Sequence, residues 1–206
     1  MYKVKIMKQT YIEIKVPLRS DAKWLAELKR AFCSSGIKVA WKIPGHPHLT
    51  LVFIDETPDV KDLVKAVTPY IHNTSTPTIT FDRLNVFLAQ SGTKYIVNLT
   101  ASTVPEEFQS LVDNIREALK RNGAVIKSAF RLHLTLGEVA TCNAEMPQIE
   151  DVLNGIILPA FSLTLRDVVF REFRGERTMF AERKLSSDTY TDLGIVGRRH
   201  YLCTRF

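Results

Sequence analysis

Hydrophobic positions along the chain follow two spacings, one typical of strands and one typical of helices. Segments that alternate apolar and polar residues, such as YIEIKVPL, predict strands, because successive side chains of a strand point to opposite faces. These segments are Tyr11–Leu18, Ile37–Ile43, His48–Ile54, Thr76–Phe87, Lys94–Thr100, Leu132–Ala140, Ala160–Phe173 and Thr178–Leu185. Apolar residues three and four positions apart predict helices. The helices are expected between Ser20 and Gly36, at Pro58–Ile71, at Pro105–Arg121 and at Pro147–Asn154.

The predicted elements fall into two rounds, β-α-β-β-α-β followed by β-α-β-α-β-β. Such an order, with many adjacent strands, indicates an α+β protein with mostly antiparallel sheets, and it points to an internal duplication. No linker or low-complexity tract divides the chain, so we expect a single domain over residues 1–187. Residues 188–206 break the pattern, and we expect them to form a C-terminal extension.

One tetrapeptide, HLTL, occurs twice, at His48–Leu51 and at His133–Leu136. The two copies are 85 residues apart (133 − 48), and each lies at the start of a predicted strand in its own round. Strand alternation places the histidine and the threonine of each copy on one face and the two leucines on the other, toward a core. If the two rounds are related by pseudo-symmetry, two imidazoles and two hydroxyls share one cleft.

Two histidines beside one phosphate can carry out a phosphodiester displacement without a metal. Because the unperturbed pKa of histidine lies near ~6.5, one imidazole can accept a proton while the other donates one at neutral pH. The hydroxyls of Thr50 and Thr135 can donate hydrogen bonds to the non-bridging phosphate oxygens. A pair of ordinary core histidines is the alternative. A zinc site is disfavoured, because each motif lacks the carboxylate and thiol ligands that zinc prefers.

Composition and charge narrow the classes of protein further. The chain has 206 residues, 45% hydrophobic and 24% charged, as in globular proteins, and no apolar run approaches the ~18 residues of a membrane helix. The N-terminus does not resemble a signal peptide, and three distant cysteines predict free thiols, so we expect a cytoplasmic protein. We also expect a monomer. Residues 1–103 carry 14 Lys and Arg against 8 Asp and Glu, which suits an anionic partner such as RNA or simply a soluble surface. No GxxxxGK[ST], GxGxxG, GxSxG or HExxH motif is present.

The two HLTL copies resemble the paired motifs of the 2H phosphoesterase superfamily, in particular its 2′-5′ RNA ligase-like (RNA 2′,3′-cyclic phosphodiesterase) branch. The segments VAWKIPGHPHLTLVFID, DRLNVFLAQSGTKYIVNL and FRLHLTL are similar to that branch in order and spacing, over roughly residues 9–187. The resemblance implies a bilobal, pseudo-two-fold-symmetric α+β fold, with two mostly antiparallel sheets facing a central cleft and the helices outside. It also implies hydrolysis of a 2′,3′-cyclic phosphate or a 2′-5′-linked phosphodiester of RNA ends or small nucleotides, with no cofactor, metal or membrane.

By motif match, His48 and His133 would be the catalytic pair, the first as proton donor and the second as acceptor, and Thr50 and Thr135 would bind the phosphate. This chain has Val52-Phe53 and Gly137-Glu138 after its motifs, where the branch often has arginine. The cation would then come from Arg131, from Lys42 or from an arginine of the Arg171–Arg177 hairpin. Phe87 and Tyr95 could stack a base, or pack in the core.

Two alternatives to an RNA phosphodiesterase remain open. The first is a catalytically silent module that binds RNA or nucleotides. The second is a phosphodiesterase for a non-RNA cyclic phosphate, such as an ADP-ribose derivative, which the altered flanking residues allow.

Overall fold

The computed structural model describes residues 9–185, except residues 20, 44, 56–58, 127 and 174–176. The expected C-terminal extension at 188–206 and the domain boundary at residue 187 lie outside these residues. The described part is an α+β protein, as the alternating patterns predict, and every strand pairing in it is antiparallel.

The strands and helices of the described residues agree closely with the sequence periodicity. The strands are β1 (Gln9–Lys15), β2 (Ala40–Trp41), β3 (His48–Ile54), β4 (Thr78–Phe81), β5 (Arg83–Leu88), β6 (Lys94–Thr100), β7 (Leu134–Ala140), β8 (Phe161–Thr164), β9 (Asp167–Phe173) and β10 (Arg177–Lys184). The helices are α1 (Lys23–Ser34), α2 (Val60–His72), α3 (Glu106–Arg121) and α4 (Met146–Asn154). Each helix buries the apolar stripe that predicted it, for example Phe108, Leu111, Val112 and Ile115 of α3.

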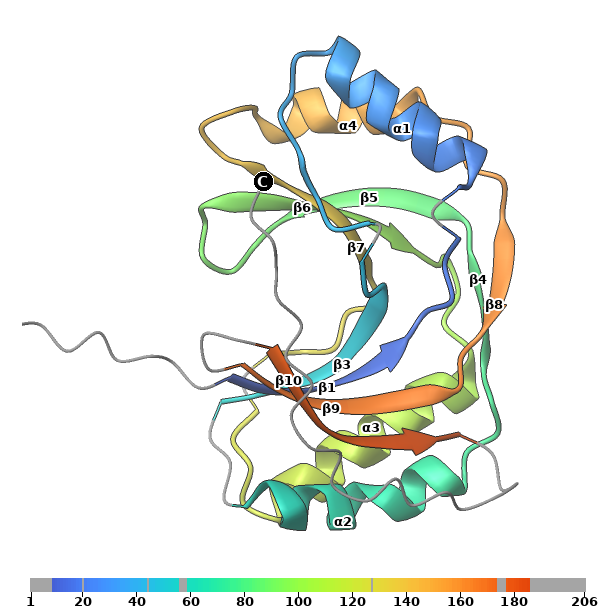
Figure 1. Ribbon diagram of the computed structural model, residues 1–206, viewed down its shortest axis with the longest axis vertical. Helices are drawn as coiled ribbons and strands as arrows, with labels where there is room; N and C mark the ends of the chain where they lie inside the picture. The colour runs from blue at the N-terminus through green and yellow to red at the C-terminus, as the bar shows by residue number, and fades with distance from the viewer. Residues whose placement is uncertain are drawn as a thin grey trace, which may run out of the picture.

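The large sheet consists of two halves. Strands β10-β9-β1-β3 form the first half-sheet, and β7-β6-β5 form the second, with β2 pairing with β7. Within the described residues the two halves are joined by one residue pair between β3 and β7, Leu49 opposite Leu134, which we call the seam. Away from the seam the two half-sheets diverge, so that they lie one above the other in the view of Figure 1.

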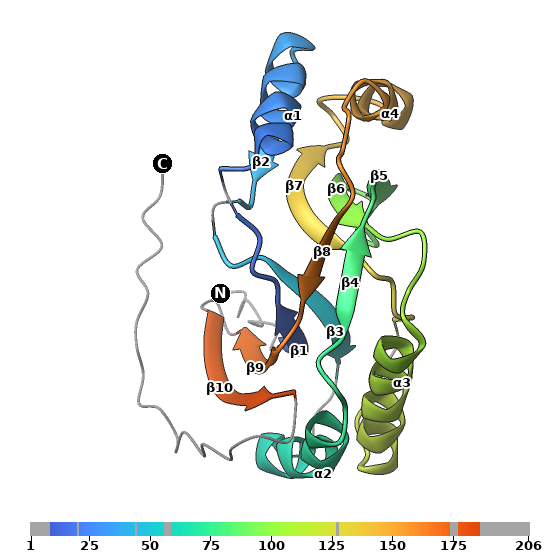
Figure 2. The same cartoon turned by 90° about the vertical axis from the view of Figure 1, so that its right-hand side faces the viewer.

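The helices lie at the two outer ends of this arrangement. Helices α1 and α4 contact each other beyond the second half-sheet, whereas α2 and α3 contact each other beneath the first. Strands β4 and β8 pair in a separate two-stranded ribbon that runs along one side of both halves (Figure 2). The expected bilobal α+β fold with outer helices is therefore present, and its two lobes are the halves of one hydrogen-bonded sheet.

The structure repeats with the same offset as the HLTL motif. Adding 85 to the residue numbers carries β1 onto β6, and it carries α1, β3, α2 and β5 onto α3, β7, α4 and β9 within about two residues at most ends. The seam obeys the same relation, because Leu134 is the equivalent of Leu49. The pseudo-two-fold axis therefore passes between these two leucines.

Three predicted strands were wrong in extent. The segments Thr76–Phe87 and Ala160–Phe173 are each divided into two strands, one in the ribbon and one in the large sheet. The breaks fall at Asp82 and at Leu165-Arg166, where the chain leaves one sheet for the other. Two consecutive polar residues interrupt the alternation there, Asp82-Arg83 and Arg166-Asp167. The strand expected at Ile37–Ile43 is reduced to Ala40–Trp41, because only that stretch reaches β7.

Candidate active site

The two HLTL motifs occupy equivalent places on either side of the seam. Leu49, Leu51, Leu134 and Leu136 are at most 1% exposed and point into the core. The histidines and threonines are partly exposed and point to the opposite face, as strand alternation requires. Because the seam pairing is antiparallel, His48 lies on the side of Thr135 and Thr50 on the side of His133.

Each motif strand contains a β-bulge at its second leucine. Thr50 pairs with Glu13 and Val52 with Ile12, so Leu51 is the extra residue of β3. In β7 the extra residue is Leu136, since Thr135 pairs with Asn98 and Gly137 with Val97. The bulge reverses the alternation after each motif. It therefore places Phe53 and Glu138 on the same face as the histidines.

Both imidazoles are held by the same backbone contact. Nδ1 of His48 lies 2.7 Å from the carbonyl oxygen of His46, and Nδ1 of His133 lies 2.9 Å from that of Arg131. A carbonyl oxygen only accepts, so Nδ1 carries the hydrogen in each ring. The neutral form of each histidine then has its lone pair on Nε2. Both side chains are thus set to exchange a proton through Nε2.

The surroundings of His133 favour its neutral form. Burial lowers the pKa of His133, and the charges of Arg131 and His48 lower it further, against the opposing hydrogen bond to the Arg131 carbonyl. The ring of Phe87 meets His133 edge to face, with centroids 5.1 Å apart. The guanidinium of Arg131 lies 4.5 Å from the centre of the Phe87 ring. Arg131 and Phe87, both expected at the site, are therefore brought to His133.

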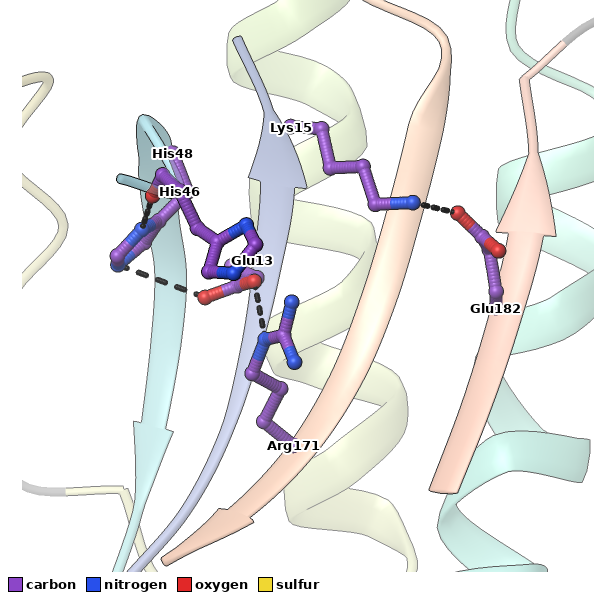
Figure 3. Close-up of polar contacts among 6 residues, drawn as sticks. All are labelled: Glu13, Lys15, His46, His48, Arg171 and Glu182. Carbon is purple, nitrogen blue, oxygen red and sulfur yellow. Dashed lines mark hydrogen bonds and ion pairs between the residues drawn. The ribbon is translucent and has the colours of Figure 1, made fainter. Parts of the chain in front are cut away.

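The surroundings of His48 are ionic. Its Nε2 lies 3.4 Å from Oε2 of Glu13, a side chain that is only 1% exposed. The other carboxylate oxygen of Glu13 accepts a hydrogen bond from Nε of Arg171. Figure 3 shows Glu13 between His48 and Arg171, with the Lys15–Glu182 ion pair further along the same face. The ring of Tyr11 lies 6.5 Å from that of His48.

The two threonine hydroxyls are available to a ligand. Thr50 and Thr135 are partly exposed beside the histidines. Within the described residues, neither hydroxyl makes a hydrogen bond to the protein. Both can therefore donate to a phosphate oxygen.

The remaining sequence candidates are placed unequally. Lys42 lies 3.2 Å from Glu138, which Lys94 also contacts at 2.8 Å, so Lys42 is at the rim of the second half-sheet and already paired. Burial opposes ionisation of Glu138, but the hydrogen bonds and charges of Lys94 and Lys42 hold its pKa below the usual value. Tyr95 is three positions from Asn98 on the regular strand β6, so it points to the opposite face and packs against the core. The structure therefore separates Tyr95 from the histidines.

A cavity of about 610 Å³ lies next to the first motif, where Pro47, the residue before His48, is part of its wall. Its charged lining consists of three cationic side chains, Lys15, Arg166 and Arg171, and two carboxylates, Glu13 and Asp167, with His46 beside them. Arg171 belongs to the hairpin expected to supply a cation. Arg174 lies outside the described residues, as does the side chain of Arg177.

Sequence reasoning missed Glu13 and Asn98. Both are completely buried, and with Thr10 they are the buried polar residues of the described core. A signal was available, because Asn98 follows Glu13 by the repeat offset of 85 residues. Among the described residues, no three or more His, Cys, Asp or Glu side chains gather in an arrangement that could hold a metal ion. No helix of the described part is long and apolar enough to cross a membrane.

The fold is that of the 2H phosphoesterases. The Thermus thermophilus protein TT0787 is similar over 88% of this chain and 100% of its own, with 14% identity and a TM-score of 0.61. Escherichia coli LigT complexed with NADP+ is 17% identical, with a TM-score of 0.56, over 86% of this chain and 98% of its own. Usb1 of Kluyveromyces marxianus is 8% identical, with a TM-score of 0.51, over 83% and 96%.

The sequence itself agrees with this similarity of fold. The family model described as "2'-5' RNA ligase superfamily" matches residues 17–177, which is most of the chain. The protein therefore belongs to the 2'-5' RNA ligase superfamily. A search of curated protein sequences finds no match.

Proposed function

We propose that the protein is a metal-independent phosphodiesterase that hydrolyses a 2′,3′-cyclic phosphate or a 2′-5′-linked phosphodiester of RNA ends or small nucleotides. The observation that carries this proposal is the arrangement of the two histidines on one face across the seam, each with Nδ1 bound to a carbonyl. Two such groups can supply the acid and the base of a displacement at phosphorus.

In the proposed reaction His133 is the base and His48 the acid. Neutral His133 takes a proton from a water molecule through Nε2, and the water oxygen forms a bond to phosphorus. The bond from phosphorus to the leaving oxygen breaks, and protonated His48 gives its Nε2 proton to that oxygen. Thr50 and Thr135 donate to the non-bridging oxygens, where negative charge grows in the transition state. Arg131 is the nearest candidate cation on the His133 side.

The substrate class follows from the surroundings of the site. The cavity next to the first motif has about 610 Å³, which lies within the range of small-ligand sites, and its three cationic side chains against two carboxylates suit an anionic group. Related solved structures are those of Escherichia coli LigT complexed with 3'-AMP and with ATP. These features support a nucleotide or an RNA end as the substrate. We further propose that the protein acts as a cytoplasmic monomer.

A substrate panel tests the proposal. It contains 2′,3′-cyclic nucleotides, RNA with a cyclic phosphate end, 2′-5′ dinucleotides and a cyclic phosphate of ADP-ribose, each assayed with and without EDTA. We expect turnover of at least one RNA-type substrate that persists in EDTA and is lost in His48→Ala and His133→Ala. Turnover of the ADP-ribose compound alone would show that the substrate is a non-RNA cyclic phosphate and not an RNA end or nucleotide. Binding of RNA without any turnover would show a silent binding module.

A further inference from the structure

The two halves of the site differ at one pair of equivalent buried positions. Glu13 pairs with Thr50 in the first half-sheet, and Asn98 pairs with Thr135 in the second. Both side chains are 0% exposed. A carboxylate therefore stands beside one motif at the position where a neutral amide stands beside the other.

Glu13 is close enough to His48 to affect its charge. At 3.4 Å from Nε2, a carboxylate with almost no solvent contact favours the imidazolium over the neutral ring. Yet Oε2 of Glu13 accepts no hydrogen bond within the described residues. The Nε2 proton is therefore stabilised by the nearby negative charge without being hydrogen-bonded to it, and it can be given to a leaving oxygen.

Arg171 accounts for the presence of a buried carboxylate. Its Nε donates to the other oxygen of Glu13, which fixes the carboxylate and compensates part of its charge. Because Arg171 is bonded to the oxygen that does not face His48, the carboxylate remains the nearer charge to the imidazole. The pair as a whole therefore still favours protonation of His48.

Asn98 brings no charge to the second half. Its Nδ2 donates to the carbonyl oxygens of Asn85 and Ile96, which anchors it within the sheet. The position equivalent to Arg171, judged by pairing with the neighbouring strand, is occupied by Phe87. His133 thus has an aromatic ring and an amide where His48 has an arginine and a carboxylate.

Other charged groups also face the two imidazoles. Lys15 and Glu182 form an ion pair on the same face of the first half-sheet, and His46 lies in the loop before β3. His133 faces His48 from across the seam, and the charges of His48 and Arg131 both act on His133 to favour its neutral form. Glu13, at 3.4 Å from Nε2, is a carboxylate of the described residues that acts in favour of protonating His48.

We propose that Glu13 is a positioning residue that keeps His48 protonated, whereas the neutral Asn98 leaves His133 free to be the base. This single difference between two symmetric halves assigns the general acid to the first motif. The inference rests on the proposed function for its catalytic meaning, but the protonation of His48 is measurable without any substrate.

The test is a pH titration of the imidazole signals of His48 and His133 by NMR, in the wild type and in Glu13→Gln. We expect the midpoint of His48 to fall by about one pH unit or more in Glu13→Gln, while His133 changes little. Glu182→Gln is the matched control, because it removes a carboxylate from the same face that pairs with Lys15 rather than His48. It should move the His48 midpoint by less than a third of that amount.

A second variant protects the test against misfolding caused by an unpaired Arg171. Glu13→Gln combined with Arg171→Gln removes both charges, so the His48 midpoint should lie between those of the wild type and Glu13→Gln. A His48 midpoint that is unchanged or raised in both variants overturns the inference. On the best substrate of the panel, the alkaline limb of the pH–rate profile should move with the His48 midpoint. If the His48 midpoint shifts as expected but no substrate of the panel is turned over, the role of Glu13 in protonating His48 stands and the proposed function is wrong.

Discussion

At the scale of single residues, the two imidazoles share one backbone contact but not one environment. Each Nδ1 is bound to the carbonyl two residues earlier, which leaves Nε2 as the reactive atom of both rings. Around that common arrangement, the first half contributes Glu13 and the second contributes Phe87. The chemical roles therefore depend on neighbours that the repeated tetrapeptide does not contain.

Replacing either histidine tests the acid–base pair. His48→Ala and His133→Ala should each lower kcat by about 10²–10⁴-fold, because each removes one proton transfer. The double variant should cost little more than one single variant, since the two groups act as a unit. Circular dichroism and the thermal midpoint should stay near the wild-type values. Near-full activity of either single variant contradicts the assignment.

The lowered pKa of His133 has a consequence for the pH dependence. A base is active when it is neutral, so the acidic limb of kcat/KM should lie below the ordinary histidine value of about 6.5. Arg131→Ala removes a nearby positive charge and some burial, so it should move this limb to higher pH. Arg131→Lys keeps the charge and should move it less. An acidic limb at or above pH 6.5 in the wild type would mean that His133 is not the base.

The threonines are expected to contribute less than the histidines. Thr50→Ala and Thr135→Ala should each lower kcat by tens- to several-hundred-fold, since each removes one donor to the transition-state oxygens. Thr→Ser at the same positions should recover most of the activity because the hydroxyl is retained. Thr80→Ala, which removes a hydroxyl bonded to Ser162 in the distant ribbon, is the control and should be near wild type.

At the scale of elements, the approach of β2 to β7 depends on a missing side chain. A Cβ on Gly137 would lie 2.5 Å from Cγ1 of Val39 and 3.1 Å from the Trp41 ring. Gly137→Ala should therefore lower the free energy of unfolding by about 1–3 kcal/mol, as overpacking does. Gly155→Ala, where the nearest atom is 3.5 Å away, is the matched control. Chemical denaturation of both variants measures the difference; equal stabilities would contradict the close packing.

Local patterns predicted most elements but not where strands change sheet. Strands β3 and β6 were predicted residue for residue, because their alternation stops at turns. At Asp82-Arg83 two adjacent polar residues interrupt the alternation, but nothing local records that Thr78–Phe81 pairs with β8 instead of β6. Similarly, the alternation of β1 assigned Glu13 to a polar face, which suggests solvent. In the structure it contacts His48 and Arg171, which come from the two neighbouring strands and are far from Glu13 in sequence.

The sequence predicted the part of the site that lies within a local motif and missed the part that comes from distant strands. His48, His133 and the two threonines share a short repeated motif, so their grouping could be expected. Arg131 and Phe87 were among the candidates that the structure brings to His133, whereas Tyr95 faces the core. Glu13 and Arg171 meet His48 from other strands, at separations in sequence that no motif spans.

At the scale of the whole molecule, neither lobe is built from one continuous segment. Helix α1 follows β1 of the first half-sheet but packs with α4 near the second, and α3 follows β6 but packs with α2 near the first. The chain therefore passes repeatedly between the lobes. Breaking either lobe removes helices and strands that support the other.

This interleaving predicts a single cooperative unfolding transition. Calorimetry should give equal van't Hoff and calorimetric enthalpies, because no lobe can persist when its partner unfolds. Fluorescence of Trp24 and Trp41, which report on the second lobe, should change together with far-UV circular dichroism. Two separated transitions would show that the lobes are independent after all.

The exchange of helices between the halves also bears on ancestry. A half-length chain with one copy of each element would cover its half-sheet only with the helix of a second copy, as an isologous homodimer. In that dimer the residues at the two buried positions would be identical, and either histidine could serve as acid. Fusion of the copies into one gene is what allows glutamate at one position and asparagine at the other. A fixed assignment of acid and base to different motifs is therefore a property that only the fused chain can have.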